Sequence, residues 1–186
     1  MTTTNQTSLT LKFLGPQWFA TVMGLAGLAL AWAAAMPKMG PAAEWVACGI
    51  GGFAALLFLG LLALFSRRGQ LHPEALTADL LHPVRHAFIA TITVALILLA
   101  TLGHALFGMS VFWETLWLIA CLLQFAVTVW VLSRWWRGNT IGGFQWPGIT
   151  PVLIIPVVGN VLAPLAGVPL GQHEWEVVQF GVGLLL

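Results

Sequence analysis

Long apolar runs take up most of this chain, and they leave few folds open to it. Of its 186 residues, 59% are hydrophobic and 7% are charged, whereas a soluble domain has about 25% charged residues. Several runs reach about twenty residues, the length that a helix needs to cross a hydrocarbon core of about 30 Å. The sequence therefore predicts an all-α integral membrane protein with several spans.

We expect six spans, and the last of them is incomplete. They cover residues 16–35, 44–65, 86–108, 112–132, 149–168 and 174–186. The final run would make a helix of only about 18 Å, too short to cross the core. We therefore interpret residues 1–186 as one transmembrane domain and as the N-terminal part of a longer chain. The first span could instead be a signal peptide, but its apolar run exceeds the usual length of about 7–15 residues.

The charges of the chain exclude one class of partner and predict an orientation. A formal net charge of +1 gives no basic excess for nucleic acid. The basic residues fall on one side of the predicted topology, except Lys38, which shares the other side with four Glu residues. By the positive-inside rule the N-terminus is then cytoplasmic. The residues on the basic side are Lys12, Arg67, Arg68, Arg85, Arg134 and Arg137.

The fifth span is apolar enough for a bilayer, yet it contains residues that break a helix. Pro156 lies inside it, and Gly159 and Asn160 follow three and four residues later. Pro156 removes an intrahelical hydrogen bond and frees the carbonyl of Val152. Unpaired backbone groups at membrane depth must be buried in protein or line a wet cavity. The Asn160 amide could bond to the freed backbone or face an anion with its NH₂ group.

Three other spans carry small or polar residues that could line a path. In the first, Ala20, Gly24, Gly27 and Ala31 form a small-residue face for helix packing or, alternatively, for pore lining. In the fourth, Gln124 and Thr128 are expected to make an interhelical hydrogen bond. In the third, one stripe faces water or a neighbouring polar helix, and we favour water. That stripe contains His86, Thr93, Thr101 and His104.

The sequence predicts neither a metal site nor a cofactor. His82 and His86 are four residues apart, but Pro83 between them places His82 outside a regular helix. Cys48 and Cys121 lie in apolar runs and are interpreted as small buried side chains. No nucleophile with a matching base is recognisable, so an enzyme is not expected.

Three motifs, taken in order, resemble one known family. They are PQWFATVMGLAGLALAW, HPVRHAF and TPVLIIPVVGNVLAPLAG. Together they are similar to the tellurite-resistance and dicarboxylate transporter family, which includes slow-type anion channels of plants and fungal malate transporters. The resemblance implies ten helices in five hairpins around a central pore, with the odd-numbered helices inside, and a homotrimer. The family's occluding phenylalanine lies on the ninth helix, beyond this chain, so the gate residue is unknown here.

From these observations we expect an anion channel or uniporter-like permease of the inner membrane. It would pass small monovalent anions and carboxylates along a path lined by the odd-numbered spans. The interiors of the five complete spans contain no charged residue, so weakly hydrated ions should be preferred. The alternative is a proton-coupled dicarboxylate or tellurite-related transporter with His86 or His104 as a proton relay.

Overall fold

The computed structural model describes residues 12–82, 84–108, 110–136, 151–164 and 173–185. The described residues form helices, and no strand occurs among them. Four helical segments are long and apolar enough to cross a membrane: Pro16–Met39, Pro41–Leu71, Arg85–Phe107 and Val111–Trp135. The predicted all-α membrane fold is thus confirmed.

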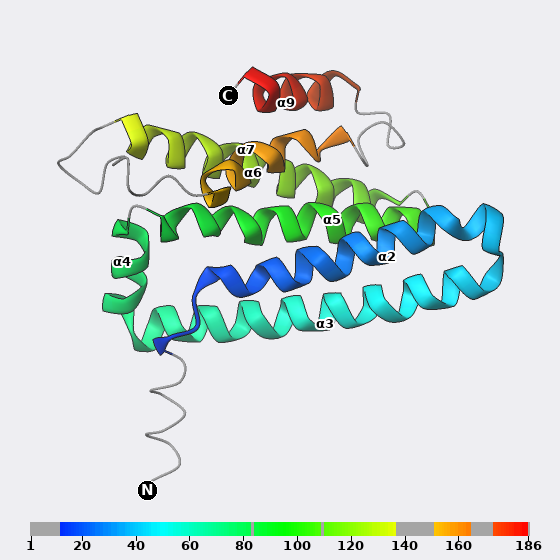
Figure 1. Cartoon of the computed structure of the whole chain (residues 1–186), viewed down its shortest axis with the longest axis horizontal. Coiled ribbons are helices and arrows are strands. Elements are labelled where there is room, and N and C mark those ends of the chain that lie inside the picture. Colours follow the sequence, from blue (N-terminus) through cyan, green and yellow to red (C-terminus); the bar gives the residue numbers. More distant parts are fainter. Residues whose placement is uncertain (1–11, 83, 109, 137–150, 165–172, 186) are drawn as a thin grey trace, which may run out of the picture.

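The four long helices lie side by side in Figure 1, with the later, shorter helices at one edge of this layer. Helix α2 packs against α3 and α5, and α5 packs against α6. Helix α7 contacts α5, α6 and α9. The elements are η1 (Pro16–Trp18), α2 (Phe19–Met39), α3 (Pro41–Leu71), α4 (Pro73–Leu81), η2 (Arg85–Ile89), α5 (Ala90–Phe107), α6 (Val111–Trp136), η5 (Pro151–Ile154), α7 (Ile155–Val161) and α9 (His173–Leu185).

Helices α2 and α3 are joined by a single residue, Gly40. Its φ of 68° lies in the left-handed region, which a glycine adopts without a steric penalty. The Gly40 amide donates to the Met36 carbonyl at 2.9 Å and so closes the last turn of α2. Pro41 then begins α3, a position where its missing N–H costs nothing.

A helix occupies most of the segment that the sequence suggested was a loop after the second span. Helix α3 continues to Leu71, and α4 covers Pro73–Leu81. The basic residues 67 and 68 suggested that the span had ended, but Arg68 is 3% exposed. Its guanidinium donates to Asp79 Oδ2 of α4 at 2.6 Å, and this ion pair compensates for burying the charge.

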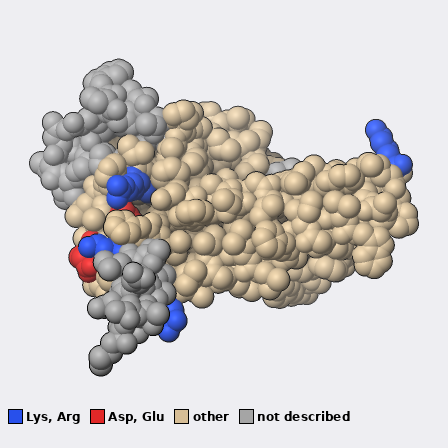
Figure 2. Space-filling model, turned by 60° about the horizontal axis from the view of Figure 1, so that its bottom comes forward, with Lys and Arg blue, Asp and Glu red and all other residues tan. Residues whose placement is uncertain are grey.

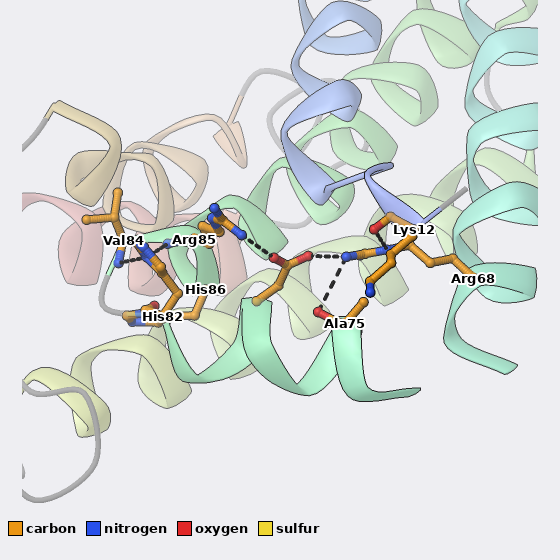
Figure 3. Close-up of polar contacts among 8 residues, drawn as sticks. Lys12, Arg68, Ala75, His82, Val84, Arg85 and His86 are labelled. Carbon is orange, nitrogen blue, oxygen red and sulfur yellow. Dashed lines mark hydrogen bonds and ion pairs between the residues drawn. The ribbon is translucent and has the colours of Figure 1, made fainter. Parts of the chain in front are cut away.

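This ion pair belongs to a corner that ties three elements together. Arg85 Nη1 of η2 donates to the other oxygen of Asp79, Oδ1, at 3.1 Å. Arg68 Nε also donates to the carbonyl of Lys12 at 3.1 Å. Figure 3 shows these contacts, which fix the chain before η1, the end of α3 and the start of η2 around α4.

The packed face of α2 is not the one that the small residues suggested. Its buried residues are Phe19, Val22, Ala26, Ala29 and Ala33, whereas Gly24 is exposed and Gly27 is half-buried. A Cβ at either glycine would meet nothing within 4 Å. Close packing through the small-residue face is therefore wrong for the described part of the chain.

Candidate functional site: a broken span beside an apolar cavity

The fifth span is interrupted as the sequence predicted. A 3₁₀ turn, η5, covers Pro151–Ile154, and the seven-residue helix α7 follows with Pro156 as its second residue. The sequence singled out the carbonyl of Val152 as the freed group. In the structure, the side-chain hydrogen bonds converge instead on the carbonyl of Pro156 itself.

Three side chains approach the Pro156 carbonyl oxygen. Gln124 Nε2 lies at 2.8 Å, Thr128 Oγ1 at 2.8 Å and Asn160 Nδ2 at 3.0 Å. A carbonyl oxygen has two lone pairs, so one more donor is available than the oxygen can pair with fully. Two of the donors come from α6, and the predicted interhelical hydrogen bonds of Gln124 and Thr128 are thus confirmed.

The polar network extends beyond this carbonyl to α5 and α9. Thr93 Oγ1 of α5 donates to Gln124 Oε1. Gln179 Nε2 of α9 contacts Asn160 Oδ1 and the Cys121 carbonyl oxygen, both at 3.1 Å. Thr93, Gln124, Asn160 and Gln179 are all buried. Burying a polar group costs free energy unless a hydrogen bond replaces its contacts with water. The hydrogen bonds of this network therefore stabilise the break in the fifth span.

The amide of Asn160 has no proton left for an anion. Its Nδ2 donates to Thr128 Oγ1 at 2.8 Å and to the Pro156 carbonyl at 3.0 Å, and an amide NH₂ has two protons. Of the two roles considered for Asn160, the structure shows the bond to the backbone. As a pore-lining residue Asn160 would act through its backbone or through the position of α7.

Gly159 is required because Gln124 lies against it. A Cβ at position 159 would lie 2.3 Å from Gln124 Nε2 and 2.7 Å from Val94 Cγ2. A larger residue would therefore separate α7 from α6 and α5 or displace the amide. Gly159 lets the amide side chain reach the Pro156 carbonyl.

A cavity of about 230 Å³ adjoins α7. It lies between α2, α5, η5 and α7, which are the first, third and fifth spans. Its walls are apolar and contain no charged side chain. The lining residues are Met23, Val94, Pro151, Ile154, Ile155, Val158 and Gly159.

The predicted polar stripe on the third span does not line this cavity. Thr93 faces Gln124 of α6, and Thr101 donates to the Ile97 carbonyl of its own helix at 2.8 Å. Both hydroxyls are buried. The structure thus places Thr93 toward a neighbouring polar helix, which was one of the two expected orientations, rather than toward water.

The two histidines of the stripe lie near opposite ends of the span. His86 is 1% exposed, its Nδ1 lies 2.7 Å from the His82 carbonyl, and its ring meets Trp130 edge-on. Because a carbonyl can only accept, Nδ1 carries the proton. His86 Nε2 and His104 Nδ1 are buried, and neither has a hydrogen-bond partner among the residues that the structure describes.

The described residues contain no group of three His, Cys, Asp or Glu side chains that could hold a metal ion. His82 Nδ1 accepts from the backbone N–H of Val84 at 3.2 Å and of Arg85 at 3.3 Å. The pair of histidines four residues apart is therefore held by backbone contacts, with the two rings drawn in Figure 3.

Sequence reasoning missed two residues that hold the broken span. Trp117 Nε1 of α6 donates to the Ala163 carbonyl at 3.2 Å, and Gln179 bonds to Asn160. A signal for Trp117 existed, because residues 117, 121, 124 and 128 follow the spacing of one helix face. That face meets α7 and α9.

Comparison with known proteins identifies the family. A profile of the SLAC1 family, described as voltage-dependent anion channel, matches residues 14–186. An uncharacterized transporter of Methanocaldococcus jannaschii is 31% identical over 170 residues, covering 88% of this chain and 46% of the relative. A tellurite resistance protein TehA homolog of Haemophilus influenzae is 26% identical, covering 90% and 50%. The chain spans about half the length of these relatives, and it belongs to the SLAC1 family of voltage-dependent anion channels.

Proposed function

We propose that this chain forms part of a passive path for small anions, and that α2, α5 and α7 line this path. The observation that carries the proposal is the apolar cavity between these helices. Family membership supports a membrane anion transporter or channel in general. An enzymatic role has no support from this family.

The chemistry of the cavity suggests which anions pass. Its lining residues offer no fixed positive charge to replace the water around an ion. An anion must then lose much of its hydration without full compensation, which costs least for large, weakly hydrated ions. We expect nitrate to pass more readily than chloride, and monocarboxylates more readily than doubly charged malate.

The charge distribution supports an orientation. Lys and Arg gather mainly at one end of the molecule in Figure 2, whereas Lys38 lies in the last turn of α2. The basic end includes the Arg68–Asp79–Arg85 corner. We propose that this end is cytoplasmic, that the protein lies in the inner membrane and that it assembles as a homotrimer. The trimer and the ten-helix ring rest on the family resemblance.

A proton-coupled transporter for dicarboxylates or tellurite-related anions is the second candidate. The observation that favours it is one buried ring nitrogen each of His86 and His104, near the two ends of the third span, that has no hydrogen-bond partner in the described part of the chain. A histidine with a free, buried nitrogen can accept a proton during transport. The two histidines lie at opposite ends of a helical segment of 23 residues, which argues against direct proton transfer between them.

Current–voltage recording of the purified full-length protein distinguishes these candidates. For a channel, we expect currents in chloride, nitrate and malate that reverse at the potential set by the anion gradient alone. A requirement for a pH gradient, abolished by His86→Ala or His104→Ala, would instead establish the coupled transporter. The absence of anion flux under both conditions would refute the proposed function.

A further inference from the structure

Gln124 lies on α6, which does not line the cavity, yet its side chain contacts α7 on the side that faces away from the cavity. Its Nε2 donates to the Pro156 carbonyl at 2.8 Å, and its Oε1 accepts from Thr93. It also fills the space beside Gly159 that a Cβ would need. Gln124 therefore joins α5 and α7, two of the three helices around the cavity.

From this geometry we infer that Gln124 is a positioning residue that sets the width of the anion path. Gly159 lies between the Gln124 amide and the cavity, because it contacts the amide and is also one of the cavity's lining residues. Any shift of α7 relative to α6 must move Ile155 and Val158 in the cavity wall. The inference rests on the proposed function for its effect on permeation, but not for its effect on the position of α7.

Other contacts explain why Gln124 holds this role rather than its neighbours in the network. Thr128 and Asn160 also donate to the Pro156 carbonyl, but neither contacts α5 in the network. Trp117 holds the far end of the break at Ala163. Only the Gln124 side chain, among these four, bonds to both helices in the described part of the chain.

The width of the cavity can be measured without any transport. A Met23→Cys/Val158→Cys pair places one thiol on α2 and one on α7, both in the cavity wall. Bis-methanethiosulfonate cross-linkers of increasing length report the distance between these thiols. The background carries Ala at Cys48 and Cys121, the free cysteines of the described chain.

Gln124→Leu should change both the preferred cross-linker length and the nitrate-to-chloride permeability ratio of the purified full-length protein. The loss of each membrane interhelical bond corresponds to a change in conformer populations of roughly 3- to 17-fold. Gln124→Leu loses the bonds to Thr93 and to the Pro156 carbonyl, so we expect cross-linking rates to change at least about 3-fold. The matched control is Ser133→Ala on the same helix, whose hydroxyl donates only to the Trp130 carbonyl of α6. The control should change neither readout.

Gly159→Ala tests the same contact from α7, should Gln124→Leu fail to fold. The added methyl group collides with Gln124 Nε2, so the preferred cross-linker length should change. Combined with Gln124→Leu, Gly159→Ala should change the cross-linking pattern by less than the sum of the two single changes, because both variants disrupt the same contact. Lower thermal stability with unchanged cross-linking and an unchanged permeability ratio would overturn the inference. Altered cross-linking in a protein that passes no anion even as wild type would retain the inference and refute the proposed function.

Discussion

At the scale of single residues, the buried polar side chains around the broken span form hydrogen bonds to backbone carbonyls and to one another. Asn160 uses both amide protons on groups within the protein. The Thr101 hydroxyl donates to a carbonyl of its own helix, and the Thr93 hydroxyl donates to Gln124. The walls of the cavity are built from apolar residues instead. The polar atoms thus determine where the helix breaks, and the apolar atoms form the surface that an ion would meet.

Asn160→Leu keeps a similar side-chain volume but removes two donors and the acceptor for Gln179. We expect a loss of about 1–3 kcal/mol in the free energy of unfolding, because buried partners remain unpaired. Thermal unfolding in detergent measures this loss. Permeability ratios should change only as far as α7 moves. An unchanged melting temperature with lost anion flux would mean that the amide contacts the ion directly.

Thr128→Val should be milder than Asn160→Leu. Gln124 and Asn160 remain to donate to the Pro156 carbonyl, and two donors are enough for its two lone pairs. Asn160 Nδ2 loses its acceptor Thr128 Oγ1, so we expect a loss of about 1 kcal/mol, the lower end of the range for a buried donor left unpaired. The same unfolding assay tests the order of the two variants, and a larger loss for Thr128→Val would contradict this account of the network.

At the scale of helices, the long apolar spans and the break at Pro156 could be predicted because both depend on local sequence. Span length follows from the run of apolar residues, and a proline in a helix interior kinks or breaks the helix because it removes a hydrogen bond. The extension of α3 and the existence of α4 could not be predicted from hydropathy. They depend on the pairing of Arg68 with Asp79, eleven residues apart, which hides a charge that otherwise marks the end of a span.

The candidate site could be predicted only in part, for a similar reason. Pro156, Gly159 and Asn160 lie within five consecutive residues, and the structure places all three in α7. Whether the polar stripe of the third span faces water or another helix depended on the residues of α6 that lie against it. Hydropathy and periodicity describe one helix at a time, so they could not show that Gln124 would meet Thr93.

Pro156→Ala should restore a backbone N–H at the start of α7. That N–H can bond to the carbonyl of Val152 and extend the α-helix into η5. Pro151 and Ile154 would then shift in the cavity wall, and the nitrate-to-chloride ratio of the full-length protein should change. Pro41→Ala, at the first turn of α3, is the control and should leave the ratio unchanged. Equal ratios in wild type and Pro156→Ala would mean that the break has no part in permeation.

Asp79→Ala should destabilise the corner between α3, α4 and η2. It leaves the guanidinium of Arg68, 3% exposed, without its counter-charge. Removing one partner of a buried ion pair costs about 3–5 kcal/mol, which should be visible as a lower melting temperature in detergent. Glu74→Gln on the exposed first turn of α4 is the control and should leave the melting temperature unchanged. A loss in Asp79→Ala no larger than in this control would show that the pair is unimportant for stability.

At the scale of the whole molecule, charge separates the two ends of the helical layer. Lys and Arg gather mainly at one end of the molecule in Figure 2. Lys38 and Glu44 lie instead beside the turn between α2 and α3, at the end of the layer opposite α4 in Figure 1. A bilayer with an anionic inner surface favours one orientation of such a layer. The family match covers residues 14–186 and includes every helix that the structure describes.

The proposed orientation predicts which sites a membrane-impermeant maleimide reaches in intact cells. Single cysteines are introduced into a protein that lacks Cys48 and Cys121. Thr77→Cys on α4 should remain unlabelled, whereas Ser110→Cys between α5 and α6 should react. Both positions are exposed in the structure, so reactivity in disrupted cells serves as the control for each. The reverse pattern would establish the opposite topology.

The one-residue connection at Gly40 also affects how the protein is made. The connection between α2 and α3 is too short to remain at the membrane surface while one of the two helices inserts alone. During synthesis, α2 and α3 should therefore enter the bilayer together as a preformed pair. The residues carried across with the turn include only two charges, Lys38 and Glu44, so the cost of moving them through hydrocarbon is small compared with the gain from two apolar helices. A longer, charged insertion after Gly40 should slow this step and reduce the yield of inserted protein, even where the finished structure has room for it.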